Sequence, residues 1–174
     1  MRRTHCLATF IIVALFPING AAQSIKAQSE LSPDAYIARR GGTLVPAGRL
    51  EIDDHRMTCG ESPTVLDPNE KDFGSAPPGF LILNPDLFAG LATSVKLWIF
   101  SHECAHQTVG SDEVKADCVA VQRGRREGWL TPAGLEQICE FMRPAREDQK
   151  HFNGVHRCEL MRQCFQETRG PPSR

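Results

Sequence analysis

The sequence lacks an excess of charge of either sign. It has 20 lysine and arginine residues against 21 aspartate and glutamate residues, which gives a formal net charge of −1 at pH 7. So small a net charge offers no general electrostatic attraction to nucleic acid or to an anionic lipid surface, and we expect neither as a partner. Internal repeats and low-complexity segments are also missing. The 174 residues suffice for one domain with its own core, but not for two.

Long apolar runs are missing as well, except for one at the start of the chain. The basic pair Arg2-Arg3 precedes the apolar stretch 7–16, and small residues follow at positions 20–22. This order is typical of a signal peptide, and the apolar stretch is short for a membrane span. We expect residues 1–22 to be removed by cleavage after Ala22, with positions 21 and 27 as alternatives. An uncleaved membrane anchor is the less favoured interpretation. The expected product is exported, periplasmic or secreted, and has no stable membrane insertion.

Cysteine pairs of the form Cys-x-x-Cys are absent, so we do not expect a zinc ribbon built from cysteines. One of the seven cysteines lies in the predicted signal peptide. An even number in the rest of an exported chain predicts disulfides, although the spacing does not choose among the many pairings. The six cysteines concerned are Cys59, Cys104, Cys118, Cys139, Cys158 and Cys164.

The first half of the mature chain contains little periodic pattern. Residues 23–48 are polar and rich in glycine, and we expect a loose N-terminal arm there. The stretch 50–58 is predicted to be a strand, and 60–79 a loop because of its proline, glycine, aspartate and serine content. Residues 79–84 (GFLILN) predict a short buried strand.

The second half predicts helices. Apolar residues recur at helical spacing, and each run is bounded by capping residues, proline or glycine. The expected fold is therefore α+β, mostly helical, with a small antiparallel sheet at the front, and its domain covers residues 49–174. Four helices are expected. The first begins at a cap on Thr93 or Ser94 and ends at Gly110. The others run from Ser111 to Gly128, from Thr131 to Phe141 and from Asn153 to Gln166.

One helix carries the pattern His102-Glu-x-x-His106. Histidines four residues apart lie on one face of a helix and can present two imidazole nitrogens to one ion. Zn²⁺ suits such ligands and lowers the pKa of bound water to about 7. Glu103 is then placed to accept the proton of that water as a general base. The pattern also occurs by chance on ordinary helices, but the apolar half-helix before it and the acids after it favour a site for one zinc ion.

Two acids compete as the third ligand. Asp112 lies ten residues after His102, the offset used by metzincin peptidases, but Val109 stands where that group has a glycine. Glu113 is the alternative, and with Asp117 it places two acids on one helix face. Glu113 would bind the metal, and Asp117 would hydrogen-bond the far nitrogen of a ligand histidine. We favour Glu113 and keep Asp112 as the alternative third ligand.

The two patterns together, His102-Glu-x-x-His106 and Glu113-x-x-Ala-Asp117, resemble the gluzincin metallopeptidases related to the type I CAAX prenyl protease and the bacterial heat-shock membrane protease. The resemblance covers roughly residues 79–166. It implies a zincin-like domain in which both histidines and Glu113 bind zinc and Glu103 is the catalytic base.

That family also has a later His-Pro pair followed by an arginine six residues after the histidine. Here His151 and Arg157 have this spacing, with Phe152 in place of the proline. The resemblance implies that His151 belongs to the catalytic site, where it would stabilise the oxyanion, although it could instead cap the last helix. Arg157 is expected to support the metal ligands together with Asp117. Only six residues separate His106 from Glu113, fewer than is usual in the family.

We therefore expect an exported zinc-dependent endopeptidase acting on peptides or unfolded proteins. The strand at 79–84 is a candidate cleft edge along which a peptide could lie. Cys104, between the two histidines, is expected in the core or in a disulfide. The alternative is a catalytically silent zinc-binding domain that holds a peptide or a partner protein. Glu103 separates the two hypotheses, because a purely structural site has no use for that carboxylate.

Overall fold

The computed structural model describes residues 32–148 and 151–169, so the predicted signal peptide lies outside the described residues. The fold is α+β, as expected. The helices are α2 (Pro33–Arg40), α3 (Pro85–Phe88), α4 (Thr93–Val109), α5 (Glu113–Glu127), α6 (Pro132–Met142) and α7 (Gly154–Glu167). The strands are β1 (Thr43–Val45), β2 (Leu50–Ile52), β3 (His55–Met57), β4 (Thr64–Leu66), β5 (Gly74–Ser75) and β6 (Leu81–Leu83).

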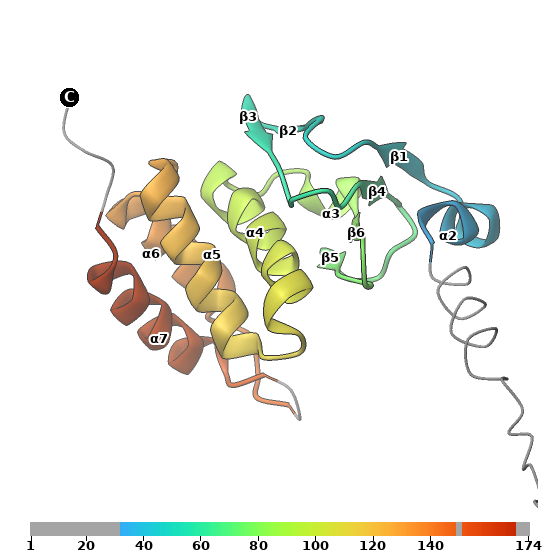
Figure 1. Cartoon of the computed structure of the whole chain (residues 1–174). Coiled ribbons are helices and arrows are strands. Elements are labelled where there is room, and N and C mark those ends of the chain that lie inside the picture. Colours follow the sequence, from blue (N-terminus) through green and yellow to red (C-terminus); the bar gives the residue numbers. More distant parts are fainter. Residues whose placement is uncertain (1–31, 149–150, 170–174) are drawn as a thin grey trace, which may run out of the picture.

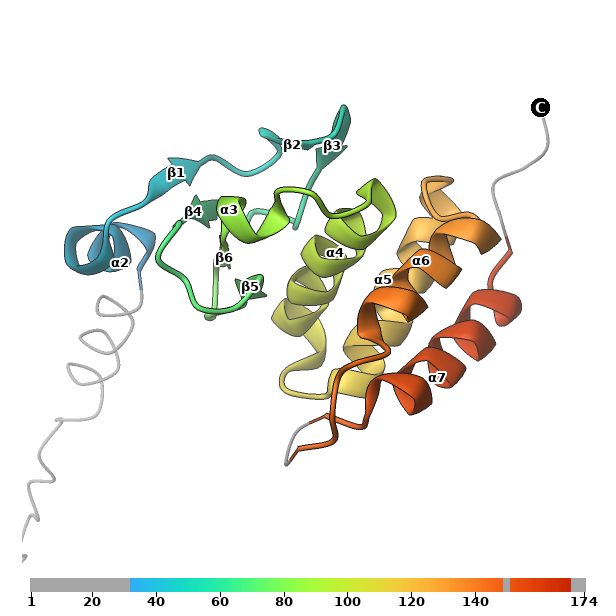
Figure 2. The same cartoon turned by 180° about the vertical axis from the view of Figure 1, so that it is seen from behind.

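Helix α4 occupies the middle of the fold. Figures 1 and 2 show the strands on one side of it and α5, α6 and α7 on the other. It packs most extensively against α5, and it also contacts α6, β2, β5 and β6. Its apolar first half, Val95–Phe100, is buried except at Lys96, because that half lies within the main core. The second half, which carries the histidine pattern, therefore starts where the core ends.

The sheet is small, as predicted, but it is mixed, whereas the prediction was an antiparallel sheet. Its strand order is β1-β4-β6-β5, and β4 pairs with β6 in parallel while the other neighbours are antiparallel. The single strand predicted over residues 50–58 is also wrong. The segment forms the hairpin β2–β3, because Asp53 and Asp54 take φ values of 45° and 66° in its two-residue turn. Aspartate tolerates this left-handed conformation, which two-residue hairpin turns require.

Two segments expected to be irregular contain regular structure. The loop predicted over residues 60–79 contains β4 and β5, and the part of the predicted arm that is described contains α2 and β1. Ser32 caps α2 by accepting a hydrogen bond from the Ala35 amide at 3.1 Å. The Tyr36 hydroxyl donates to the buried Asp67 carboxylate at 2.7 Å. Helix α2 is thus held against the sheet by tertiary contacts, which a local pattern does not reveal.

The predicted helices in the second half are present, and two of the expected caps are wrong. Ala92, not Thr93 or Ser94, is the N-cap of α4, because those two hydroxyls donate to Asp53 and Gln137 instead. The N-cap of the next helix is Asp112 rather than Ser111. The cap at Thr131, the start of the last helix near Asn153, and the ends of α4 at Gly110 and α5 at Gly128 are confirmed.

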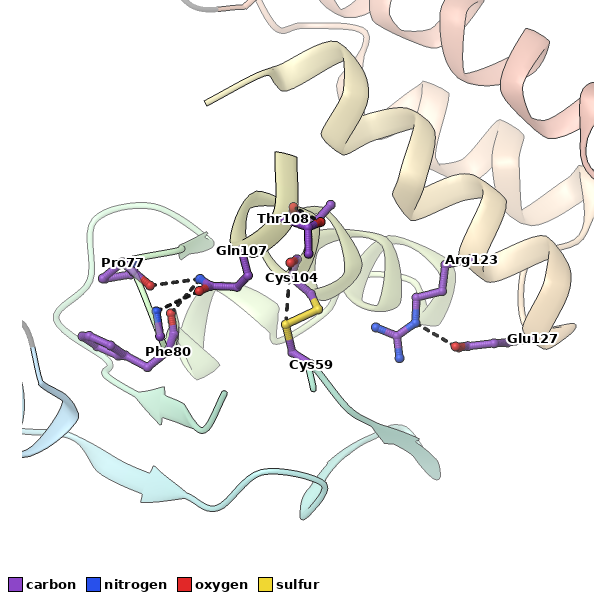
Figure 3. Close-up of a disulfide and its surroundings, with 10 residues drawn as sticks. Cys59, Pro77, Phe80, Cys104, Gln107, Thr108, Arg123 and Glu127 are labelled. Carbon is purple, nitrogen blue, oxygen red and sulfur yellow. Dashed lines mark hydrogen bonds and ion pairs between the residues drawn. A yellow bond between two sulfur atoms is a disulfide. The ribbon is translucent and has the colours of Figure 1, made fainter. Parts of the chain in front are cut away.

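The six cysteines form three disulfides, as predicted. Each one connects segments that are distant in the sequence. The first joins α4 to the segment before β4 (Figure 3), the second joins α5 to α7, and the third joins α6 to α7. The pairs are Cys59–Cys104, Cys118–Cys164 and Cys139–Cys158. Within residues 32–148 and 151–169, no helix has the length and apolar character of a membrane span.

Candidate metal centre

Three side chains from two helices converge where α4 and α5 meet. His102 and His106 come from α4 and Glu113 from the first turn of α5, and their ligand atoms all lie within 4.8 Å of one another. The Nε2 atoms of the two histidines are 3.1 Å apart, and Glu113 Oε2 lies 3.1 Å from His102 Nε2 and 3.5 Å from His106 Nε2. Ligands at 2.0–2.1 Å from a tetrahedral zinc ion are separated by about 3.4 Å. The cluster therefore has the dimensions of a site that could hold a metal ion.

The orientation of His106 is fixed by the turn between the helices. Its Nδ1 lies 2.6 Å from the carbonyl oxygen of Gly110, and a carbonyl only accepts, so Nδ1 carries a proton and donates it. Gly110 closes α4 with a φ of 65°, a conformation that glycine adopts without strain. This contact leaves the Nε2 lone pair of neutral His106 available to a cation. The sequence pattern did not point to the Gly110 carbonyl.

The second histidine is held in the same sense by an acid. Nδ1 of His102 lies 2.9 Å from Oδ1 of Asp117, one helical turn after Glu113 on α5. At this distance the carboxylate attracts a proton on the facing ring nitrogen. It favours a proton on Nδ1 and a lone pair on Nε2. Two imidazole lone pairs and one carboxylate oxygen thus face a common point, an arrangement that a cation stabilises.

Protons supply this positive charge when no metal is bound. Burial alone would lower the pKa of His102, but contacts with Asp117 and Glu113 outweigh it and raise the pKa to about 9. The interaction with Glu113 also raises the pKa of His106. Burial opposes ionisation of Glu113 and Asp117, yet their histidine neighbours hold the pKa of both carboxyls below the usual range. The two carboxylates therefore favour positive charge at the histidines, which a bound cation could supply in place of the protons.

Asp117 also forms a buried ion pair with Arg157 of α7. Arg157 Nε donates to Oδ2 of Asp117 and Nη2 donates to Oδ1, both at 2.7 Å. The two residues are only 2% and 7% exposed, and the guanidinium lies 5.8 Å from the centre of the Trp98 ring. The arginine therefore fixes the carboxylate that faces His102. Asp117 and Arg157, the two residues predicted to support the metal ligands, thus lie on the Nδ1 side of His102.

His151 lies beside the cluster rather than within it. Its Nε2 is 3.2 Å from Glu113 Oε2, and its Nδ1 is 3.1 Å from a carboxylate oxygen of Asp148. It is not a member of the group whose ligand atoms all lie within 4.8 Å. The interpretation of His151 as the cap of the last helix is wrong, because Asn153 caps α7. Its ring stays one third exposed at the cleft.

Asp112 does not reach the cluster. Its Oδ1 accepts a hydrogen bond from the Lys115 amide at 3.0 Å, and its Oδ2 lies 2.9 Å from the Lys115 ammonium group. As the N-cap of α5, it is used in starting the helix that presents Glu113. The structure thus brings Glu113 to the two histidines and leaves the alternative ligand outside.

The candidate metal site opens into a cleft of about 1360 Å³, which Glu103 also lines. Burial raises the pKa of the Glu103 carboxyl, although the two histidines oppose this effect. The side chain packs closely against Gly74 of β5: a Cβ atom placed on that glycine would lie 2.9 Å from Glu103 Cγ. Strand β5 therefore runs directly beside the candidate base.

The prediction that the strand at residues 79–84 forms the edge of the cleft is wrong. Residues 81–83 form β6, which is paired on both sides, by β4 and by β5, and cannot accept another strand. The edge strands of the sheet are β1 and β5, and both residues of β5 line the cleft. These two residues, Gly-Ser, carry no apolar alternation, so no local pattern predicts a strand there.

Comparisons of the chain with protein-family models, with curated proteins and with solved structures find no match. The likeness of the two sequence patterns to the gluzincins stays a prediction. The chemistry of the site rests on the arrangement of its own residues.

Proposed function

We propose that the chain is a zinc-dependent endopeptidase that hydrolyses peptide bonds in peptides or unfolded proteins. The observation that carries this proposal is the convergence of His102, His106 and Glu113 within a cleft that also contains Glu103. A structural zinc site is usually closed by four protein ligands, whereas a catalytic site has three and stays open to substrate. Three ligands beside an open cleft support the catalytic alternative.

The ligand set supports zinc as the metal. Two neutral imidazoles and one carboxylate are a donor set that catalytic zinc sites use. When bound in such a site, zinc lowers the pKa of a water molecule toward 7 and polarises a substrate carbonyl. Asp117 and Arg157 keep His102 oriented for this role, and the Gly110 carbonyl does the same for His106.

Glu103 supplies the proton transfer. It follows His102 directly in α4 and lines the cleft without belonging to the group of ligands. Its carboxylate accepts the proton of the attacking water and later donates it to the leaving amine. Burial moves its pKa upward, which suits a group that must first accept and then donate a proton near neutral pH.

His151 is placed to act on the substrate carbonyl. Its ring is partly exposed to the cleft and lies beside Glu113. Asp148 contacts its Nδ1 at 3.1 Å, which keeps the ring from rotating away. As negative charge develops on the carbonyl oxygen, a ring N–H of His151 can donate a hydrogen bond to it.

The free edge of β5 supports an extended substrate. A peptide that pairs with this edge passes beside Glu103, because β5 and Glu103 are in contact. Strand addition uses backbone hydrogen bonds and needs a segment that is not folded, which favours peptides and unfolded proteins as substrates. The three disulfides support an oxidising location, in the periplasm or outside the cell.

Metal analysis combined with a hydrolysis assay tests the proposal. The protein, purified without chelators, is expected to contain about one zinc ion per chain and to cleave a fluorescently labelled unfolded protein. A chelator should abolish cleavage and added Zn²⁺ should restore it. Zinc without any hydrolysis would favour the silent binding domain, and the absence of stoichiometric metal would reject both interpretations.

A further inference from the structure

Gln107 makes three hydrogen bonds to one loop. The residue follows His106 on α4, and the loop joins β5 to β6. The side-chain amide Nε2 donates to the carbonyl oxygens of Pro77 and Phe80 at 2.9 and 3.2 Å, and Oε1 accepts from the Gly79 amide at 2.8 Å. Figure 3 shows the side chain extending from the helix to this loop. A single amide thus satisfies three backbone groups of a five-residue connection.

The same side of α4 carries a covalent link. Cys104, three residues before Gln107, forms its disulfide with Cys59. Figure 3 shows the side chains of Cys104 and Gln107 leaving the helix toward the sheet half of the fold. Residues three apart on a helix share a face. His102 and His106 project from another side, toward α5. Helix α4 is therefore fixed to the sheet half of the fold by a side other than the one that carries His102 and His106.

The loop held by Gln107 determines where β5 lies. It follows directly after Ser75, and three of its residues, Ala76, Pro78 and Gly79, line the cleft. At the other end of β5, Gly74 packs against Glu103 so closely that a Cβ atom would not fit without a shift. Strand β5 has only two residues and one neighbouring strand, so its own pairing contributes little to holding it.

We propose that Gln107 is a positioning residue that holds the edge strand β5 beside Glu103, so that an extended peptide lies in register with the metal centre. This inference rests on the proposed peptidase function. Gln107 lines the same cleft, but its side-chain hydrogen bonds go to the loop and not to the candidate metal ligands. It acts through the loop, and its contribution applies only to substrates long enough to pair with β5.

The test compares two variants on two substrates. Gln107→Met keeps the length of the side chain and removes all three hydrogen bonds, whereas Gln107→Glu keeps an acceptor for the Gly79 amide and loses both donors. Gln122→Met on α5 is the matched control, because its amide makes only a 3.8 Å contact with Cys118 Sγ. Each protein is assayed for zinc content, for hydrogen exchange in residues 74–80, and for kcat and KM on a long and a short fluorogenic peptide.

For Gln107→Met, we expect unchanged zinc content and faster hydrogen exchange in residues 74–80. The KM for the long peptide should rise about 10-fold or more, because the three lost hydrogen bonds together contribute at least the free energy that this factor corresponds to. The KM for the short peptide and kcat should stay within about twofold of the wild type. Gln107→Glu should be impaired at least as much as Gln107→Met, because a carboxylate oxygen would face the carbonyl oxygens of Pro77 and Phe80. The control should match the wild type.

Two results would overturn the inference while leaving the proposed function intact. One is an unchanged long-peptide KM in both Gln107 variants although the wild type is active. The other is an equal loss on both peptides, which indicates a general structural role. If the wild type itself hydrolyses neither peptide, the proposed function fails and the inference fails with it.

Discussion

The buried pair Asp117–Arg157 permits a sharp test of how the candidate metal ligand His102 is held. Asp117→Asn keeps the size of the side chain but removes the negative charge that neutralises a guanidinium only 7% exposed. Breaking a buried ion pair by changing one partner costs about 3–5 kcal/mol of unfolding free energy. We expect a loss of this size, measured by urea unfolding of the chelator-treated protein so that metal binding does not contribute.

The same change should also weaken metal binding. Asp117 lies 2.9 Å from His102 Nδ1, and removing such a supporting carboxylate typically lowers metal affinity about 10- to 100-fold. Competition with a zinc-sensitive dye measures this affinity. The exposed pair Glu136–Arg162 is the matched control, because it is also bidentate, at 2.9 and 2.6 Å. Glu136→Gln should cost at most about 1 kcal/mol and leave zinc affinity unchanged.

A double variant separates the two effects. Adding Arg157→Met to Asp117→Asn removes the unpaired buried charge, and replacing a whole buried ion pair by less polar groups is often close to neutral. Stability should therefore recover substantially, while zinc affinity stays low because His102 still lacks its carboxylate partner. If Asp117→Asn binds zinc within twofold of the wild type, the argument that Asp117 supports His102 is wrong.

Two further predictions follow from the same cluster. Glu113→Ala should lose most of its zinc in elemental analysis while Asp112→Ala keeps it and loses only about 1 kcal/mol of stability as a helix cap; the reverse pattern would make Asp112 the ligand. In the metal-free protein, the folded-state pKa of His102 is about 9, above its ordinary value of 6.5, so its contribution to stability is complete below pH 6.5 and is lost as the pH rises through 9. The difference between the two pKa values corresponds to about 3 kcal/mol of unfolding free energy. Urea unfolding of the wild type should show this loss of stability between pH 6.5 and pH 9.5, and His102→Gln should not show it.

The convergence of the candidate metal ligands could be predicted because their spacing is local. His102 and His106 are one turn apart on α4, Glu113 and Asp117 are one turn apart on α5, and a short turn at Gly110 brings the two helices together. Helical periodicity therefore determines most of the arrangement once the helices are recognised. Arg157 lies 40 residues from Asp117, and only the resemblance to a family suggested that it belongs nearby.

The elements that the sequence did not reveal depend on distant contacts. Strand β5 has two residues without apolar alternation, and it exists because β6 pairs with it and Glu103 packs on it. Helix α2 has eight residues, too few to be stable alone, and it depends on contacts such as Tyr36 to Asp67. The disulfide pairing and the Gln107 contacts likewise join residues that only the folded chain brings together.

The central claim is that Glu103 acts as the base of a zinc peptidase, and Glu103→Gln tests it most directly. The amide keeps the size of the carboxylate and Glu103 is outside the ligand group, so zinc content and thermal midpoint should stay as in the wild type. An amide cannot accept a proton at neutral pH, and loss of a positioned base costs about 100- to 10,000-fold in rate. We therefore predict a folded, zinc-loaded protein whose peptide hydrolysis falls by at least about 100-fold. Hydrolysis at the wild-type rate by a fully zinc-loaded Glu103→Gln would contradict the account.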